Sequence, residues 1–389
     1  MNLKKVVNTD DMRTLAKSKL PRLVFDFIDG GVDGEEALDH NLAAFRRYRL
    51  LPRYLTGADR IDQSTTLFGT EYASPFGIAP MGLLGFFRPT ADLILARAAH
   101  KMRVPYVMSS ASSDSLEAAK ELAPDMWFQL YLTRRQEIND DLVRRAREAG
   151  VHVLVVTVDI PTAAKRERNM RNGFKRPMKM TPSVILQGMV RPSWALRFYR
   201  TGGMPVMKNW APYASDPNDA DSVADLYGSQ TPAPEIKWDT IERMRSSWKG
   251  ALVIKGVLDP ADAEKCAALG VDGVIVSNHG GRQLDRAPSA LEMLPAINRA
   301  VGDKLVVMMD GGIRRGADIF TAFGLGAKAA FVGRPAIFAA AAAADPGAAK
   351  LLEMYRHELE IVMRQMGCAS LAEITPDRLL DQTRGLPGT

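Results

Sequence analysis

The sequence predicts a (β/α)8 barrel with an N-terminal helical cap and a long insertion after the fourth strand. Short apolar runs alternate with helical stretches after residue 70, and about eight such pairs occur. Strands separated by helices form a parallel sheet, and eight such units close into a barrel. The predicted strands are Pro75–Ala79, Tyr106–Ser109, Trp127–Tyr131, Val153–Asp159, Leu252–Gly256, Val274–Ser277, Leu305–Asp310 and Ala329–Val332.

We interpret the 389 residues as a single domain with four parts. Residues 1–70 lack this alternation of strands and helices and are expected to form a helical cap with a short hairpin. Residues 71–159 and 238–345 form the barrel, 160–237 the insertion, and 346–389 a C-terminal helix and tail. The alanine run before Asp345-Pro346-Gly347 predicts a helix that these residues end.

Sequence signals for helix starts agree with the predicted order of strands and helices. Asp114-Ser115-Leu116-Glu117 and Thr133-Arg134-Arg135-Gln136 resemble capping boxes, and Asp259-Pro260 places a cap residue before a first-turn proline. A doubly wound sheet would instead need a glycine-rich fingerprint after its first strand, and Met81-Gly82-Leu83-Leu84-Gly85 does not match one.

The insertion between Asp159 and Trp238 is far longer than a normal βα loop. Its first half is basic and apolar. Its second half, from Asp216 to Pro234, is acidic and rich in proline, which is typical of a mobile segment.

Composition sets broad limits. Hydrophobic residues make up 46% and charged residues 25%, and the formal charge of +6 is too dilute to indicate nucleic acid. Cys266 and Cys368 form no CxxC motif, so we expect no metal site and a reduced, cytoplasmic setting. The sequence contains no signal-peptide core and no apolar stretch of membrane-spanning length.

Polar residues at the predicted strand ends indicate the active site, because barrels of this class place working groups there. The sixth strand leads into Ser277-Asn278-His279-Gly280-Gly281-Arg282, which places a base near an anion anchor. Asp310-Gly311-Gly312-Ile313-Arg314 and Gly333-Arg334 follow strands seven and eight, where such barrels hold phosphate.

Lys255 within an apolar strand requires an anionic partner. Asp159 could also be a simple helix cap. Arg166 could also be part of a run of charged residues exposed to solvent. The other histidines, at 40, 100, 152 and 357, are expected to be structural.

These motifs, with Phe128-Gln129-Leu130-Tyr131 and Thr157-Val158-Asp159, resemble the FMN-dependent L-2-hydroxy acid dehydrogenase and oxidase family over nearly the whole chain. This family includes glycolate oxidase, flavin L-lactate dehydrogenase and (S)-mandelate dehydrogenase. The resemblance implies an FMN cofactor and oxidation of a 2-hydroxy acid to a 2-oxo acid. It also implies a homo-oligomer, often a tetramer.

The resemblance also implies roles for individual residues. His279 is the base and Asp159 orients it, Arg166 and Arg282 clamp the substrate carboxylate, Tyr131 lies beside the substrate oxygen, and Lys255 lies near flavin N1. The flavin and ribityl chain are expected to contact Ala79, Pro80, Met81, Gly82, Ser109, Gln129, Thr157 and Ser277. The ribityl and phosphate groups are expected to contact Asp310, Gly311, Gly312, Ile313, Arg314, Gly333 and Arg334.

Three departures from the family pattern affect the substrate and the electron acceptor. Position 27 carries phenylalanine where the family usually has a tyrosine that binds the carboxylate, and Ala111 replaces a large aromatic residue of glycolate oxidase. Within a lactate- or mandelate-like class of substrate, both changes favour a bulkier acid with a branched or aromatic side chain over simple lactate. Gly82 resembles the dehydrogenase members, since oxidases commonly carry alanine there.

The acceptor is therefore expected to be something other than oxygen. In some dehydrogenases of the family the insertion contacts the membrane, where quinones are the oxidant, and the basic and aromatic residues from Lys175 to Arg200 suit such an interface. A lid or an oligomer contact is the alternative for this segment. Alternatives for the whole chain are an oxygen-using oxidase, an FMN- or phosphate-binding barrel isomerase of the type 2 isopentenyl-diphosphate kind, and a flavoprotein without turnover.

Overall fold

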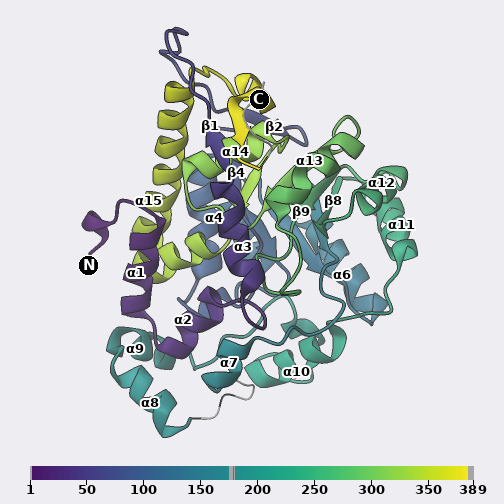
Figure 1. The fold of residues 1–389 in the computed structure, drawn as a ribbon. Coiled ribbons are helices and arrows are strands. Elements are labelled where there is room, and N and C mark those ends of the chain that lie inside the picture. Colours follow the sequence, from purple (N-terminus) through teal and green to yellow (C-terminus); the bar gives the residue numbers. More distant parts are fainter. Residues whose placement is uncertain (1, 175–177, 179, 384–389) are drawn as a thin grey trace.

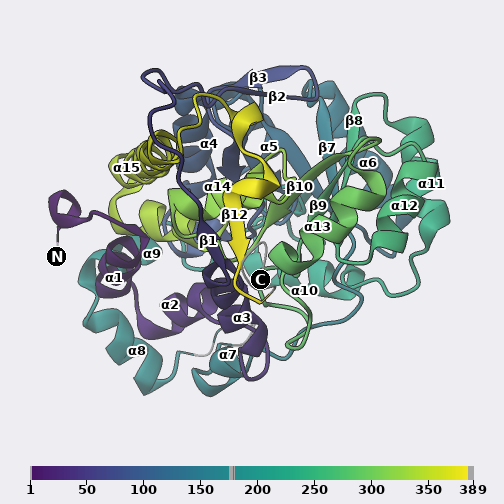
Figure 2. The ribbon, with the colours of Figure 1, turned by 45° about the horizontal axis from the view of Figure 1, so that its top comes forward.

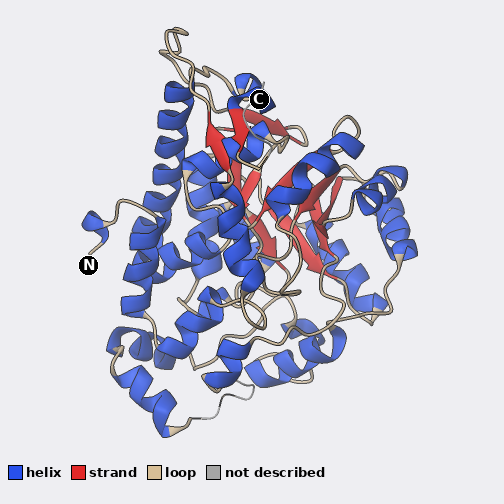
Figure 3. Cartoon of the chain, viewed as in Figure 1, coloured by secondary structure: helices blue, strands red, loops and turns tan. Residues whose placement is uncertain are grey.

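A closed parallel sheet forms the centre of the molecule in a computed structural model that describes residues 2–174, 178 and 180–383 (Figures 1 and 3). The strand order is β4-β11-β10-β9-β8-β7-β6-β5, and a parallel bridge between Ile78 and Tyr106 joins the two ends. All eight predicted strands are present within two residues, so the predicted barrel is confirmed. They are β4 (Phe76–Ile78), β5 (Val107–Ser109), β6 (Trp127–Tyr131), β7 (Val153–Thr157), β8 (Ala251–Val257), β9 (Gly273–Val276), β10 (Val306–Asp310) and β11 (Ala330–Val332).

Alternation along each strand separates the barrel interior from the layer under the helices. Val153 and Val155 of β7 belong to the interior cluster, whereas Leu154 and Val156 pack outward. The hairpin of β2 (Thr65–Leu67) and β3 (Thr70–Tyr72) closes the N-terminal end, where Trp127 Nε1 donates a 3.0 Å hydrogen bond to the Tyr72 hydroxyl. Polar side chains occupy inward positions toward the other end: Ser109, Gln129, Thr157, Lys255, Ser277 and Asp310.

In the described part of the chain, eight helices follow the strands, and they lie around the outside of the sheet (Figure 2). The predicted cap at Asp259 is confirmed, because its carboxylate accepts from the backbone N–H of Ala261. The predicted capping boxes were wrong: the residue before α5 is Ser115, not Asp114, and α6 follows Arg135, because the Thr133 hydroxyl donates to the Arg135 carbonyl instead. The helices are α4 (Ala91–Met102), α5 (Leu116–Leu122), α6 (Gln136–Glu148), α11 (Trp238–Ser247), α12 (Pro260–Ala268), α13 (Ala290–Val301), α14 (Gly316–Gly324) and α15 (Arg334–Met366).

Helix α15 is broken close to the predicted end of the alanine-rich helix. Its backbone leaves the helical conformation at Ala343 and Ala344, and Asp345-Pro346-Gly347 begin a second helical stretch after this break. A proline in the first turn of a helix has no N–H bond to lose, which explains why Pro346 is compatible with this restart.

The N-terminal cap is helical as predicted, with η1 (Leu3–Lys5), α1 (Thr9–Lys19), α2 (Arg22–Asp29) and α3 (Glu36–Arg46). The hairpin extends slightly beyond the expected cap, to Tyr72. One pairing was not predicted: β1 (Tyr48–Leu50) runs antiparallel to β12 (Leu379–Asp381), which follows η4 (Leu371–Glu373) and η5 (Pro376–Arg378). The Arg47–Asp381 ion pair, with Nη2 and Oδ2 2.6 Å apart, supports this contact between distant segments.

The described residues of the insertion form helices and no strand, as expected (Figure 1). Within the acidic second half, residues 220–230 form helix α10, whose Val223 is fully buried. No helix among the described residues is both long enough and apolar enough to cross a membrane. The insertion helices are α7 (Glu167–Arg171), α8 (Pro182–Met189), α9 (Pro192–Arg200), η3 (Ala211–Tyr213) and α10 (Ala220–Gln230).

Candidate active site

A cavity of about 500 Å³ lies at the C-terminal ends of the barrel strands, between the sheet, the cap and the insertion. Asp159 lies behind one of its walls, and Ser109, Gln129 and Ser277 are buried near its floor. The predicted site residues that line it are Ala79, Pro80, Met81, Gly82, Tyr131, Thr157, Arg166, Lys255, His279, Arg282, Asp310, Gly311, Gly312, Ile313, Arg314, Gly333 and Arg334.

His279 and Asp159 form a hydrogen-bonded pair at one side of this cavity. The distance between Nδ1 of His279 and Oδ1 of Asp159 is 2.8 Å. Burial opposes ionisation of Asp159, but the charge of His279 and its hydrogen bond outweigh burial and lower the pKa of the carboxyl. Asp159 is therefore an anion placed to stabilise a protonated imidazole.

The turn that carries His279 is conformationally demanding. His279 has φ 58°, in the left-handed region that non-glycine residues seldom adopt, and Gly280 and Gly281 follow with positive φ. A Cβ on Gly281 would lie 2.6 Å from the backbone nitrogen of Leu38, so the cap packs directly against this turn. His279 is thus held by the backbone and by the hydrogen bond from its own N–H to Ser277 Oγ, 3.0 Å long.

A buried polar network lies beneath the cavity. Lys255 Nζ is 2.9 Å from Ser277 Oγ and 3.0 Å from Asp310 Oδ2, and Ser277 Oγ donates to Asp310 Oδ1. Burial disfavours the ammonium, but Asp310 and Asp159 outweigh that effect and raise the pKa of Lys255. The lysine therefore carries a fixed positive charge, and Asp310 is the anionic partner that the sequence required.

Four arginines line the cavity with little compensating negative charge. Burial lowers the pKa of Arg166 and Arg314, and burial with mutual repulsion lowers that of Arg282 strongly and that of Arg334 to about 9. Arg166 Nε is buried without a hydrogen-bond partner among the described residues. Such a cluster is stabilised by bound anions.

Backbone carbonyls at the end of α2 hold two of these arginines, a contact that no sequence motif indicated. Arg282 donates to the carbonyls of Phe27 (3.1 Å) and Gly30 (2.8 Å), and Arg334 donates to those of Ile28 (3.0 Å) and Gly30 (2.9 Å). The C-terminal end of a helix carries partial negative charge, so α2 orients cations toward the cavity without neutralising them.

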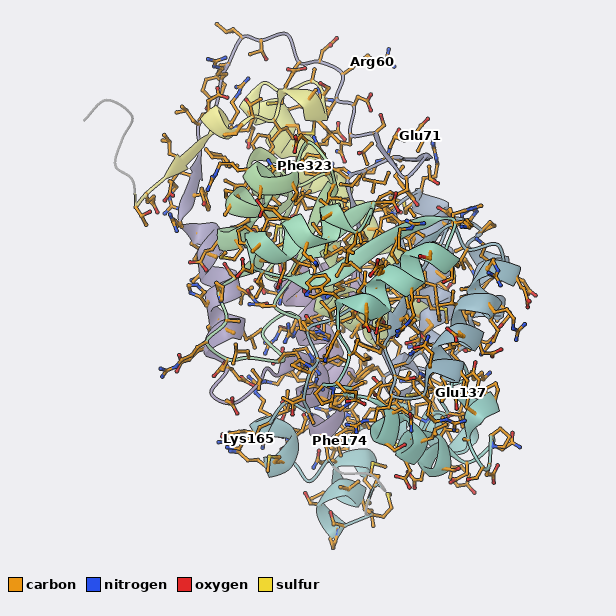
Figure 4. The ribbon with its side chains drawn as sticks, turned by 90° about the vertical axis from the view of Figure 1, so that its right-hand side faces the viewer. Arg60, Glu71, Glu137, Lys165, Phe174 and Phe323 are labelled. Atoms are coloured by element: carbon orange, nitrogen blue, oxygen red, sulfur yellow. The ribbon has the colours of Figure 1, made fainter. Side chains whose placement is uncertain are left out.

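An aromatic wall closes the side of the cavity nearest the insertion. Phe27 lies 5.9 Å from Phe87 and 4.7 Å from Phe174 between ring centroids, and the Arg282 guanidinium lies 5.6 Å from the Phe27 centroid. Figure 4 shows Phe174 at the insertion end of the molecule, opposite Arg60 and Glu71. This side of the cavity therefore has an apolar surface.

Tyr227 of α10 is a site residue that the sequence did not reveal. Its ring stands edge-on to Tyr131 at 6.5 Å and to Trp210 at 4.9 Å, and it lines the cavity. Burial raises the pKa of both Tyr131 and Tyr227, so both phenols are neutral donors beside Arg166. Its position in a segment without strand or motif explains why only the folded chain identifies it.

The cavity floor fits a polar planar cofactor with a phosphate tail. Both amide atoms of Gln129 and Oγ1 of Thr157 are buried without hydrogen-bond partners among the described residues. At the other end, a Cβ on Gly311 would meet no atom closer than 3.7 Å, which leaves its backbone open to close approach. No group of three potential metal-ligating side chains occurs in the described part of the chain.

Together, the barrel and this donor set define an enzyme that binds an anionic cofactor and an anionic substrate at the barrel mouth. The family model for FMN-dependent dehydrogenases matches residues 16–381. The chain belongs to this family, and FMN is its cofactor.

Relatives are similar over nearly their full lengths. (S)-mandelate dehydrogenase of Pseudomonas putida is 37% identical over 98% of this chain and 95% of its own. An L-lactate dehydrogenase of Caulobacter vibrioides (strain NA1000 / CB15N) is 38% identical over 97% of this chain and 98% of its own.

A crystal structure of the monotopic membrane protein (S)-mandelate dehydrogenase superposes with a TM-score of 0.93, at 36% identity over 97% of this chain and 100% of that one. A mandelate oxidase variant with (S)-mandelic acid gives a TM-score of 0.81, at 34% identity over 97% and 98% of the two chains. The insertion is thus part of a fold shared with a membrane-associated relative.

Proposed function

We propose that this enzyme oxidises an L-2-hydroxy acid to the 2-oxo acid, with His279 as the base. The observation that carries the proposal is that one cavity joins the His279–Asp159 pair to Arg166 and Arg282. Bound FMN supplies the acceptor for the two electrons that leave the substrate. The roles given to individual residues rest on this arrangement and on the family pattern.

Arg166 and Arg282 bind the substrate carboxylate, since forked donors match the two oxygens of a carboxylate. His279 accepts a proton, and Asp159 stabilises the imidazolium that forms. The proton leaves either the hydroxyl, with hydride transfer, or the α-carbon. In both cases the substrate loses two electrons and two protons and its carbinol carbon becomes a carbonyl.

The cofactor residues divide by chemistry. Gln129 and Thr157 offer unpaired polar atoms to the flavin ring, together with Ala79, Pro80, Met81, Gly82, Ser109 and Ser277. Lys255 places its charge at the N1 side, where a cation favours the reduced ring. The ribityl and phosphate groups would be held by Asp310, Gly311, Gly312, Ile313, Arg314, Gly333 and Arg334.

The aromatic wall favours a substrate with a large apolar side chain. Phe27 provides no hydroxyl for the carboxylate, and its ring packs with Phe87 and Phe174. Ala111 also lines the cavity and leaves space that a larger residue would fill. We therefore assign a lactate- or mandelate-like class, with aromatic or branched acids ahead of lactate.

We assign a non-oxygen acceptor and a peripheral membrane location, with a quinone as oxidant. Residues 173–215 contain seven lysines and arginines and no acidic residue. Helices α8 and α9 also expose apolar side chains, with Leu186, Met189 and Tyr199 60%, 69% and 83% exposed. A basic segment with an outward apolar face matches the inner, anionic surface of a cell membrane.

The decisive test follows the flavin absorbance of the purified protein under anaerobic conditions. Glycolate, lactate, (S)-mandelate and longer 2-hydroxy acids are mixed with it in turn, and bleaching is expected to be fastest with the bulky acids. No bleaching with any acid would overturn the proposed reaction. Re-oxidation with oxygen and with a soluble quinone then separates an oxidase from a dehydrogenase, and we expect the quinone to be faster.

A further inference from the structure

Two arginines outside the active site flank the junction between the barrel and the insertion. Arg88 follows η2 (Leu84–Phe86), and Arg197 lies on α9. This junction is tightly built: Trp194 Nε1 donates a 3.0 Å bond to the Phe86 carbonyl, and the Phe86 ring lies 5.9 Å from that of Trp194 and 6.2 Å from that of Phe198. Packing therefore fixes α9 against the segment that leads into Arg88.

Neither arginine is satisfied by the described residues. Arg197 Nε is buried without a hydrogen-bond partner, and Arg88 makes one long contact, 3.5 Å, to the Ala341 carbonyl. Asp345, the carboxylate whose charge raises the pKa of Arg88, is itself ion-paired with Arg97. Burial lowers the pKa of both arginines, and repulsion from Arg88 lowers that of Arg197 further. A bound anion would offset the cost of partly burying these two cations.

The surroundings of this pair indicate the kind of anion. Arg197 shares α9 with Leu196 and Tyr199, which are 50% and 83% exposed, and α8 next to it exposes Leu186 and Met189. An anion that also has apolar chains would cover both features, whereas a free inorganic anion would cover only the arginines.

We propose that Arg88 and Arg197 bind the phosphate of a membrane phospholipid whose acyl chains lie along the exposed apolar side chains of α8 and α9. This inference rests on the membrane association proposed above. The forked guanidinium donors hold the phosphodiester, and the site fixes how deeply the insertion enters the lipid headgroups.

The test compares variants of the FMN-loaded enzyme in co-sedimentation with phosphatidylglycerol vesicles. Arg197→Gln is matched by Arg200→Gln, which removes the same charge from an exposed position on the same helix. Arg88→Gln is matched by Arg60→Gln, at the opposite end of the molecule (Figure 4). At low ionic strength, the loss of one positive charge near the membrane, as in Arg200→Gln, should weaken vesicle binding about fivefold. At high ionic strength diffuse attraction is screened, and we expect Arg197→Gln and Arg88→Gln to bind about tenfold more weakly than their controls.

Each other outcome has a defined meaning. If the unaltered enzyme does not bind vesicles, the proposed membrane association fails. If it binds but Arg197→Gln and Arg200→Gln behave alike at both ionic strengths, the phosphate site is wrong. If calorimetry shows that inorganic phosphate binds at this pair and prevents vesicle binding, the pair is a site for soluble phosphate and the lipid assignment is wrong. Anaerobic flavin reduction by (S)-mandelate should be unchanged in all four variants, which verifies their folding.

Discussion

Asp159 and His279 reach each other from two different strand ends, and their side chains meet with Oδ1 and Nδ1 2.8 Å apart. Asp159 follows β7 and His279 follows β9, with β8 between them. This contact fixes which ring nitrogen faces the carboxylate, so Nε2 is the nitrogen left to exchange a proton with a substrate.

Asp159→Asn should lower the rate of flavin reduction by about 10²- to 10⁴-fold, because an amide cannot stabilise the imidazolium that forms. FMN binding should be unchanged, since Asp159 does not line the cofactor half of the cavity. Stopped-flow absorbance with (S)-mandelate measures the rate. A variant that reduces its flavin at the normal rate would show that the carboxylate charge plays no part.

Lys255→Met should destabilise the enzyme by about 3–5 kcal/mol, because it leaves the Asp310 carboxylate buried without its ammonium partner. Lys255→Met combined with Asp310→Asn removes that uncompensated charge and should recover at least half of the lost stability. FMN affinity should stay low in both variants. Urea unfolding and flavin fluorescence measure the two effects, and equal stability losses in the two variants would contradict the ion-pair explanation.

Asp29 should make the stability of the cap depend on acid pH. Burial would raise its pKa, but hydrogen bonds from Arg13 and Arg168 outweigh burial and lower it. A carboxyl whose pKa is lower in the folded than in the unfolded state stabilises the fold when the pH is above the unfolded-state pKa. That contribution is lost as the pH falls below about 4. Asp29→Asn should therefore cost about 1–3 kcal/mol at pH 7 and less at lower pH.

Urea unfolding between neutral pH and pH 3 tests this dependence. Asp10→Asn is the control, because Asp10 is an exposed carboxylate of the same cap. A constant difference between Asp29→Asn and the unaltered protein at every pH would contradict the assignment.

Phe27→Tyr should improve binding of small 2-hydroxy acids. A hydroxyl at this position adds a donor for the substrate carboxylate, and a hydrogen bond to a charged group corresponds to about tenfold or more in affinity. KM for lactate should fall with little change in kcat. Phe174→Tyr, which places a hydroxyl on the same wall, is the control, and an equal effect of both changes would indicate only a general gain in polarity.

The barrel and the catalytic half of the site followed from local patterns. Strands such as Val153–Thr157 alternate between interior and helix-facing positions, so the polar residue at the last inward position must open into the barrel mouth. The same rule placed Lys255 and Asp310, and His279 stood out because two glycines follow it just past a strand end.

The rest of the site depends on contacts between distant segments. Nothing local to Tyr227 indicates that it stands beside Tyr131, and the α2 carbonyls that hold Arg282 and Arg334 are 252 and 304 residues away from them along the chain. The β1–β12 pairing is also set by tertiary packing. Capping predictions failed at Thr133 because its hydroxyl had a nearer backbone acceptor, the Arg135 carbonyl.

The central claim is that His279 is the base, and the most direct test is anaerobic stopped-flow reduction of the flavin in His279→Gln. FMN should remain bound, because His279 lines the substrate side of the cavity. Reduction by (S)-mandelate should slow by about 10²- to 10⁴-fold. Reduction at the rate of the unaltered enzyme would contradict it.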